Sequence, residues 1–131
     1  MRMEMKNNPV GWFEIPVADM DRAIRFYEAV FGFSIKRYQL GPLDMGWFPM
    51  VEGGGGCSGS LVHHEQFYTP SVNGTLVYFT AHSGDLSIEL SRVEAAGGKI
   101  VFPRKQISEE YGYMAVIMDS EGNRIALHSR N

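Results

Sequence analysis

Two residues near opposite ends of the chain have side chains that could support proton transfer. Glu14 lies in the apolar stretch 10–17, and His128 ends the apolar stretch 124–128. Because residues alternate between the faces of a strand, both side chains are expected on the face away from the helices. If both strands border one cavity, the pair can act as base and orienting group, or as two metal ligands. Alternatively, Glu14 forms a salt bridge with Arg124, and His128 lies at a solvated strand end.

A second group of residues could bind a ligand without reacting with it. Aromatic rings and methionine offer flat, polarisable surface on which a planar or amphipathic molecule can stack. Some members of the group are expected to be core residues instead. The predicted ligand-binding residues are Trp12, Trp47, Tyr78, Tyr111, Tyr113, Met114 and Arg124.

Other reactive residue types have patterns that favour ordinary structural roles. His63 and His64 are neighbours, so they point to opposite faces of a strand and do not form a paired metal clamp. Cys57 has no predicted base beside it, and a nucleophilic cysteine needs one. The glycine run 53–56 and the polar loop 106–111 are expected to form mobile rims of a pocket.

The elements that position these residues come from an internal duplication. The stretches 12–32 and 78–98 each read as an apolar strand, a polar turn, a helix and a glycine stop. At a shift of 66 residues, Phe13 aligns with Phe79 and Tyr27 with Val93. Neither half has enough chain for an independent core, so the halves should bury each other and leave a concavity between them.

Each half is predicted to have the order βαβββ, within a single domain spanning 1–131. The first module covers about 9–64, the linker 65–74 and the second module about 75–129, after a loose tail at 1–8. The expected strands are 10–17, 34–40, 44–51, 58–63, 75–81, 99–102, 113–118 and 124–128, and the expected helices are 20–31 and 85–96.

Composition excludes several classes of function. The net charge of −3 arises from interspersed charges without a basic run, which argues against a nucleic-acid partner. No apolar stretch approaches the roughly 20 residues of a membrane helix, and the N-terminus has no signal-peptide pattern. Cys57 is the only cysteine, which excludes an internal disulfide and predicts a cytoplasmic location.

Three stretches together resemble the vicinal oxygen chelate superfamily, which includes glyoxalase I, bleomycin-resistance proteins and extradiol dioxygenases. They are Ile15–Phe33 with its Phe-Tyr and Gly-Phe pairs, Arg92–Ile100, and Asp119–Leu127 with its Asp-Ser-Glu-Gly-Asn turn. The resemblance covers about residues 9–129. It implies an α+β fold in which two tandem βαβββ modules form a curved mixed-sheet cup with the helices outside.

The resemblance also allows a test for the family's metal site, which takes ligands from the first and fourth strands of each module. The first-strand positions hold Trp12 and either Tyr78 or, if the turn 81–85 carries two extra residues, Leu76. The last strand has Ala126 where the family has glutamate, and the stretch 58–62 offers no carboxylate or imidazole. We therefore expect no cofactor and no metal at that site.

Three functions remain open on these grounds. The first is a cytoplasmic protein that binds a small organic molecule, with lyase or isomerase chemistry by Glu14 and His128 if it is an enzyme. The second is a non-catalytic binding or sequestering protein. The third is a metal-dependent lyase or dioxygenase with a displaced site made of Glu14, His128 and either His63 or His64. Exposed sheet edges and the resemblance predict a homodimer, with the cup formed within one chain or across two.

Overall fold

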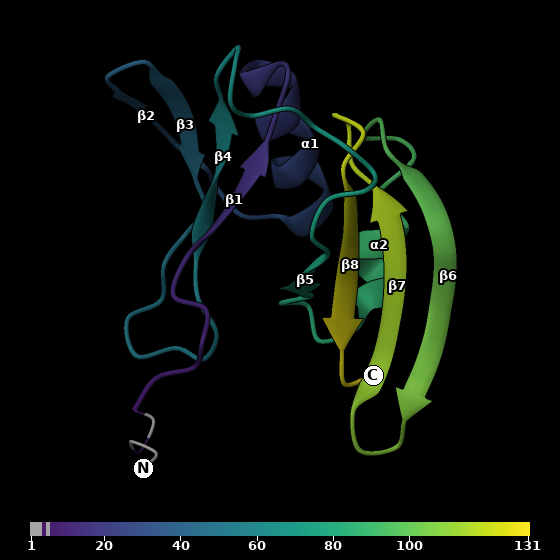
Figure 1. The fold of residues 1–131 in the computed structure, drawn as a ribbon. Coiled ribbons are helices and arrows are strands. Elements are labelled where there is room, and N and C mark those ends of the chain that lie inside the picture. The colour runs from purple at the N-terminus through teal and green to yellow at the C-terminus, as the bar shows by residue number, and fades with distance from the viewer. Residues whose placement is uncertain (1–3, 5) are drawn as a thin grey trace.

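The predicted element order occurs twice in the structure, a computed structural model that describes residue 4 and residues 6–131. Part of the predicted tail at 1–8 lies outside the described residues. The first module contains β1 (Phe13–Pro16), α1 (Met20–Phe31), β2 (Lys36–Leu40), β3 (Leu43–Trp47) and β4 (Gly59–His63). The second contains β5 (Val77–Thr80), α2 (Leu86–Leu90), β6 (Lys99–Ser108), β7 (Gly112–Met118) and β8 (Arg124–Ser129). The predicted α+β class and βαβββ order are confirmed (Figure 1).

Each module forms its own four-stranded mixed sheet. The strand orders are β1-β4-β3-β2 and β5-β8-β7-β6, so the first strand of each module lies at one edge. That strand runs parallel to the last strand of its module, with Phe13 beside Gly59 and Val77 beside Ile125. In Figure 1 the sheets stand side by side, with β1 and β5 at the edges nearest each other. No helix among the described residues is long and apolar enough to cross a membrane.

Helix α1 begins and ends at the residues that its sequence predicts. The Asp19 side chain accepts a hydrogen bond from the Arg22 backbone N–H, which satisfies one free donor of the first turn. The helix ends at Gly32, whose φ of 75° is the left-handed conformation that glycine adopts without strain. On β3, a Cβ at Gly46 would lie 3.2 Å from the Met20 sulfur, so glycine there allows the sheet to approach the helix closely.

Two predicted boundaries in the second module were wrong. Helix α2 covers only Leu86–Leu90 rather than 85–96, and the chain continues as turns in which several N–H groups bond three residues back. This tightening brings Gly98 against α1. A Cβ atom added at Gly98 would lie only 2.6 Å from the Phe26 ring, so glycine is needed there. Strand β6 runs to Ser108 instead of stopping at Pro103. Pro103 has no backbone N–H to donate, but β6 is an edge strand with register shifts, and such a strand tolerates proline.

The first strands of the two modules are offset by two residues fewer than the helices and the last strands are. Val17 N–H bonds to Val62 at the end of β1, and Ala81 N–H bonds to His128 at the end of β5, an offset of 64. The helices start at Met20 and Leu86, an offset of 66. The turn 81–85 therefore carries the two suspected extra residues. Consequently Leu76, not Tyr78, is equivalent to Trp12, and Tyr78 is equivalent to Glu14.

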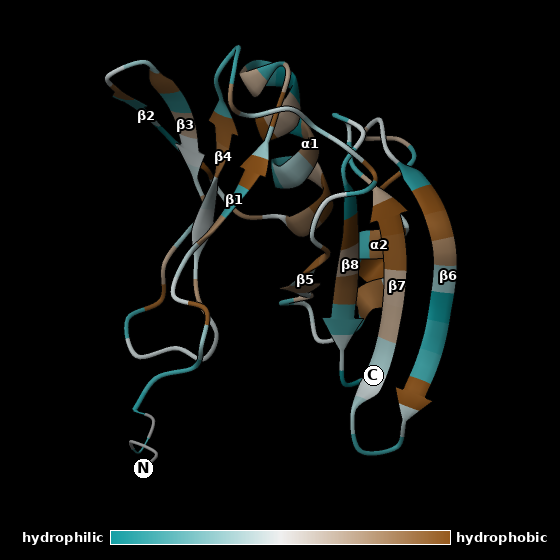
Figure 2. Cartoon of the chain, in the orientation of Figure 1, coloured by the Kyte–Doolittle hydropathy of each residue, from teal (hydrophilic) through white to brown (hydrophobic). Residues whose placement is uncertain are grey.

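The two modules share one hydrophobic core. Tyr27 and Phe31 of α1 lie against Phe79 of β5, with ring centroids 5.6 and 4.9 Å apart, and Phe48 joins the same cluster. The remaining core comes from both helices and from the helix-facing residues of both sheets. In Figure 2 brown apolar stretches follow strands of both sheets, among them β1, β4, β7 and β8.

Polar contacts also connect the modules at the turn between β7 and β8. The Glu121 carboxylate accepts hydrogen bonds from the backbone N–H groups of Ala18 and Asp19 at 2.9 and 2.8 Å. It also pairs with Arg22 at 2.7 Å. Although burial disfavours the charged form of Glu121, the hydrogen bonds from Arg22 and Asp19 outweigh it and hold the pKa below its usual 4.5.

Candidate functional site

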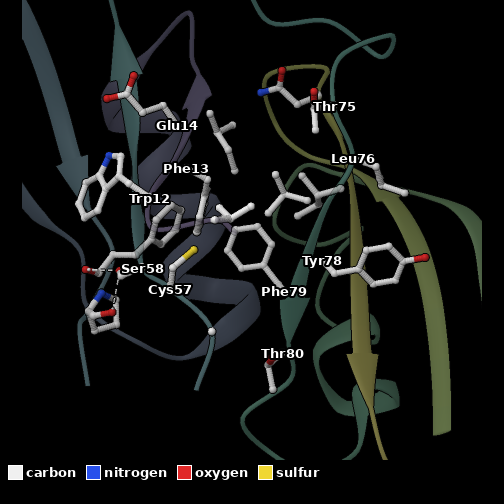
Figure 3. Close-up of a pocket in the computed structure, with 18 of the residues that line it drawn as sticks. Trp12, Phe13, Glu14, Cys57, Ser58, Thr75, Leu76, Tyr78, Phe79 and Thr80 are labelled. Atoms are coloured by element: carbon white, nitrogen blue, oxygen red, sulfur yellow. Dashed lines mark hydrogen bonds between the residues drawn. The ribbon is translucent and has the colours of Figure 1, made fainter. Parts of the chain in front are cut away.

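An open cleft of about 1400 Å³ separates β1 from β5 (Figure 3). Its inner wall is aromatic and belongs to the shared core: Phe13, Phe33, Phe48 and Phe79 line it. The loops on either side supply the rim, including the glycine run with Cys57 and the segment that leads into β5. A mostly apolar lining with a few polar groups is typical of a small-molecule site.

Strand alternation places Trp12 and Glu14 as the sequence predicts. Ile15 and Val17 are buried beneath α1, whereas Trp12 and Glu14 lie on the other face. Trp12 is 36% exposed, and its ring contacts the Trp47 ring edge-on, with centroids 5.3 Å apart. Because Ile15 and Val17 are buried whereas Trp12 and Glu14 are exposed, the register of the first strand agrees with the prediction, and the strand edge brings Trp12 and Glu14 to the cleft.

Glu14 has a hydrogen-bond partner that the local sequence does not predict. The Tyr68 hydroxyl donates a hydrogen bond to Glu14 Oε1 at 2.6 Å. This hydrogen bond, with some desolvation, raises the pKa of Tyr68 above 10.0. Tyr68 lies in the linker between the modules, 54 residues from Glu14, and its local pattern gives no signal of this contact.

His128 is separated from Glu14 within the chain. It lies on β8 beside Thr80 and Met114, and its Nε2 is 2.5 Å from the carbonyl oxygen of Tyr111. His128 is not among the cleft-lining residues. The structure therefore gives Glu14 and His128 different partners, and their catalytic roles stay predictions.

The alternative salt bridge between Glu14 and Arg124 does not form within the chain. Among the described residues, the salt bridges join Arg22 to Glu121, and Arg37 to Asp21 and Asp44. Arg124 is exposed and lines the cleft on the side of β8. The cleft thus has a carboxylate on one wall and a guanidinium on the other, without direct contact between them.

The other predicted ligand-binding residues divide into two groups. Tyr78 lines the cleft and is 51% exposed. Trp47 of β3 packs against Trp12 across the intervening strand β4. Three residues do not line the cleft: Tyr113 and Met114, which lie on β7, and Tyr111, which lies in the turn before β7. The ring of Tyr113 lies under the Arg104 guanidinium, 3.7 Å away.

The residues at the family's metal-ligand positions do not fit a divalent ion. With the repeat register now fixed, these positions are Trp12 and Ser60 in the first module and Leu76 and Ala126 in the second. They supply no carboxylate or imidazole, which such ions require. Ser60 Oγ is buried without a hydrogen-bond partner, and so is the Nε1–H of Trp47 on the neighbouring strand. The Trp47 Nε1–H is a hydrogen-bond donor and cannot ligate a cation, so this pair does not form a metal site.

The residues of the displaced site are also engaged elsewhere. His63 Nδ1 lies 3.0 Å from the Val17 carbonyl, and His64 Nδ1 accepts hydrogen bonds from two backbone N–H groups that follow it. Within residues 4 and 6–131, no three His, Cys, Asp or Glu side chains converge as a metal site would require. We derive no step through a metal, and the absence of a metal cofactor remains a prediction.

A family model described as the Glyoxalase/Bleomycin resistance protein/Dioxygenase superfamily matches residues 10–127. No curated protein matches the chain. A glyoxylase/bleomycin resistance protein/dioxygenase domain from Frankia sp. EAN1pec superimposes with a TM-score of 0.69 at 18% identity, covering 93% of this chain and 97% of that one. A glyoxalase/bleomycin resistance protein from Albidiferax ferrireducens T118 gives 0.65 at 20% identity, covering 95% and 100%.

Glyoxalase I from Zea mays has a TM-score of 0.68 at 17% identity. The match covers 93% of this chain but only 46% of the maize chain, so the present chain spans about half of that enzyme. At these identities the structural neighbours establish the fold and leave the reaction open.

Proposed function

Because the chain belongs to the glyoxalase/bleomycin resistance protein/dioxygenase superfamily, we propose that it binds a small organic molecule in the cleft beside β1. The observation that supports this most is the placement of one fixed carboxylate, Glu14, at the edge of an aromatic cleft. We further propose that the protein acts in the cytoplasm, consistent with its lone cysteine.

The apolar part of such a ligand has an evident binding surface. Phe13 and Phe79 lie between the two strands with ring centroids 5.7 Å apart, and Trp12 presents an exposed ring at the margin. Stacking on these rings favours a planar or amphipathic molecule. The ligand class we propose is therefore an aromatic or amphipathic compound that carries an N–H or O–H group.

Glu14 supplies the polar contact. The Tyr68 hydroxyl occupies one acceptor site of Oε1, which leaves Oε2 free to accept a hydrogen bond from the ligand. The same contact holds the carboxylate in one orientation, as a base must be held to take a proton from bound substrate. In an enzyme of this kind Glu14 is the base and Tyr68 the residue that positions it.

Binding without chemistry is the second candidate function. It is favoured by one observation: His128, the predicted partner of Glu14, bonds to the Tyr111 carbonyl and lies off the cleft. A sequestering protein needs the aromatic wall of the cleft and Glu14 as a hydrogen-bond acceptor, but it needs no second proton-transfer group.

Ligand titration followed by tryptophan fluorescence tests the proposal. The probes are planar aromatic amines, phenols and their methylated analogues, which lack the N–H or O–H. We expect saturable changes in tryptophan fluorescence with the amines and phenols. Glu14→Gln should bind these probes at least tenfold more weakly, a loss of about 1.4 kcal/mol of binding free energy. Glu109→Gln, an exposed carboxylate off the cleft, is the matched control. If wild type and Glu14→Gln bind methylated and unmethylated probes equally well, Glu14 does not accept a hydrogen bond from the ligand and the proposal is refuted.

A further inference from the structure

Two side chains of the first sheet have buried polar atoms without hydrogen-bond partners. They are Trp47 on β3 and Ser60 on β4, and no other buried side-chain nitrogen or oxygen within the described part of the chain is unpaired. Folded proteins pair nearly all buried polar groups, because an unpaired one lowers stability. Gly46 faces α1, so its neighbour Trp47 and the cross-strand partner Ser60 point side by side to the opposite face.

This unpaired pair lies next to the carboxylate of the proposed site. Ser60 is the register partner of Glu14 on β1 and also of Trp47 on β3, so the three side chains form one row across the sheet. The Glu14 carboxylate accepts hydrogen bonds, whereas the Trp47 Nε1–H only donates and the Ser60 hydroxyl can donate. The row therefore offers one acceptor and two donors to the same bound molecule.

The Trp12 ring covers this row. Because β4 lies between β1 and β3, the contact of the Trp12 and Trp47 rings passes above β4, and Ser60 beneath it is fully buried. Tyr38 also packs against Trp47, with ring centroids 4.7 Å apart, which fixes that indole in place. Trp12, in contrast, adjoins the edge strand β1 and is 36% exposed, so its ring can turn without disturbing the core.

The two donors and the acceptor fit a carbonyl group that stands beside an N–H group. A carbonyl oxygen has two lone pairs, so it can accept from the Ser60 hydroxyl and the Trp47 Nε1–H together. The adjacent N–H then donates to Oε2 of Glu14, the oxygen that Tyr68 leaves free. A carboxylate in the same place is disfavoured, because its charge would lie beside that of Glu14.

We propose that the bound molecule carries a carboxamide or lactam group, and that Ser60 and Trp47 bind its carbonyl oxygen once the Trp12 ring has turned from Trp47 onto the ligand. This inference deepens the proposed function and rests on it for the position of the ligand beside Glu14. Ser60 and Trp47 then determine specificity, since they favour a head group with a carbonyl over a plain amine. In the complex, both of their buried polar atoms are paired.

Urea unfolding of Ser60→Ala tests the unpaired hydroxyl without a ligand. Alanine removes the hydroxyl without breaking a hydrogen bond, so the midpoint should match or exceed that of wild type. Ser34→Ala, at an exposed serine off the cleft, is the matched control. A midpoint clearly below both would show that the hydroxyl is bound within the fold, and would overturn its assignment to a ligand.

Nuclear magnetic resonance of the indole N–H groups tests the ligand class. The chain has two tryptophans, so isotope-labelled protein gives two Nε1–H signals, which Trp12→Phe and Trp47→Phe assign. Benzamide should shift the Trp47 signal saturably and bind about tenfold more tightly than aniline, which has the N–H but no carbonyl. This preference should disappear in Ser60→Ala and in Trp47→Phe and persist in Ser34→Ala. Circular dichroism melting establishes that each variant is folded.

The outcomes separate this inference from the proposed function. If aniline binds and benzamide binds no more tightly, or if the preference survives in Ser60→Ala and Trp47→Phe, the carbonyl assignment is refuted and the proposed function stands. N,N-dimethylbenzamide has the carbonyl but no N–H. If it shifts the Trp47 signal as benzamide does and Glu14→Gln changes nothing, the role of Glu14 is refuted and the carbonyl assignment stands. If none of these probes gives a saturable response, both are overturned.

Discussion

Tyr68, in the segment that joins the modules, donates its hydroxyl hydrogen to Glu14 of β1 over 2.6 Å. The contact holds the linker against the face of the first sheet that points away from α1. It also fixes the orientation of Glu14, the carboxylate that β1 contributes to the cleft.

Ionisation of Tyr68 should report on this contact. The hydrogen bond to Glu14 raises the pKa of Tyr68 above 10.0, so the contact stabilises the fold fully below pH 10.0 and is lost as pH rises through the shifted value. In Glu14→Ala the titration should move back toward 10.0. The measurement is tyrosinate ultraviolet absorbance, with Tyr68→Phe subtracted to isolate this residue. Superimposable curves for wild type and Glu14→Ala would contradict the contact.

Removal of the Trp12 ring should weaken ligand binding and leave folding nearly unchanged. The ring is 36% exposed and lines the cleft, so Trp12→Ala should cost about 1–3 kcal/mol of binding free energy if stacking is direct. Calorimetric titration with the best aromatic probe measures the loss. Phe67→Ala, an aromatic that is 78% exposed and lies off the cleft, should bind as wild type does.

Purified protein should contain much less than one divalent ion per chain. Trp12, Ser60, Leu76 and Ala126 occupy the family's ligand positions, and none is a usual ligand of such an ion. Elemental analysis after dialysis is the measurement. About one equivalent of Ni, Zn, Mn or Fe would disprove the prediction, and release of that metal by Glu14→Ala and by His128→Ala would establish the displaced site.

Acid should destabilise the protein partly through Glu121. Its pKa in the folded state lies below 4.5, so its ionised form contributes stability above about pH 4.5 that is lost as pH falls through the folded value. Glu121→Ala should lower the free energy of unfolding by about 2–3 kcal/mol at neutral pH, since charged hydrogen bonds to Arg22 and two backbone N–H groups disappear.

Urea unfolding at several pH values measures this effect. The difference between wild type and Glu121→Ala should shrink below pH 4.5, because the wild type loses the same contacts on protonation. Glu109→Ala, in an exposed loop, should change stability by less than about 0.5 kcal/mol. A difference that stays constant down to acid pH would contradict the assignment.

The fold followed from the sequence where signals are local. Asp19 and Gly32 mark the ends of α1, and apolar periodicity identifies the strands. Helix α2 was predicted too long because its last turns depend on the contact of Gly98 with Phe26, which no local pattern encodes.

The site was predictable in part for the same reason. Alternation placed Trp12 and Glu14 on the correct face of β1. It could not reveal Tyr68, whose contact depends on the path of the linker. It also could not decide whether Glu14 and His128 border one cavity, since that depends on how two sheets pack.

The shared ring cluster has a consequence for how the protein unfolds. Phe79 of the second module lies against Tyr27 and Phe31 of the first, so neither module retains a closed core when the other opens. Heating should then produce one calorimetric transition, with equal van't Hoff and calorimetric enthalpies. A fragment that ends in the linker would expose the faces of its aromatic rings and should remain without cooperative structure.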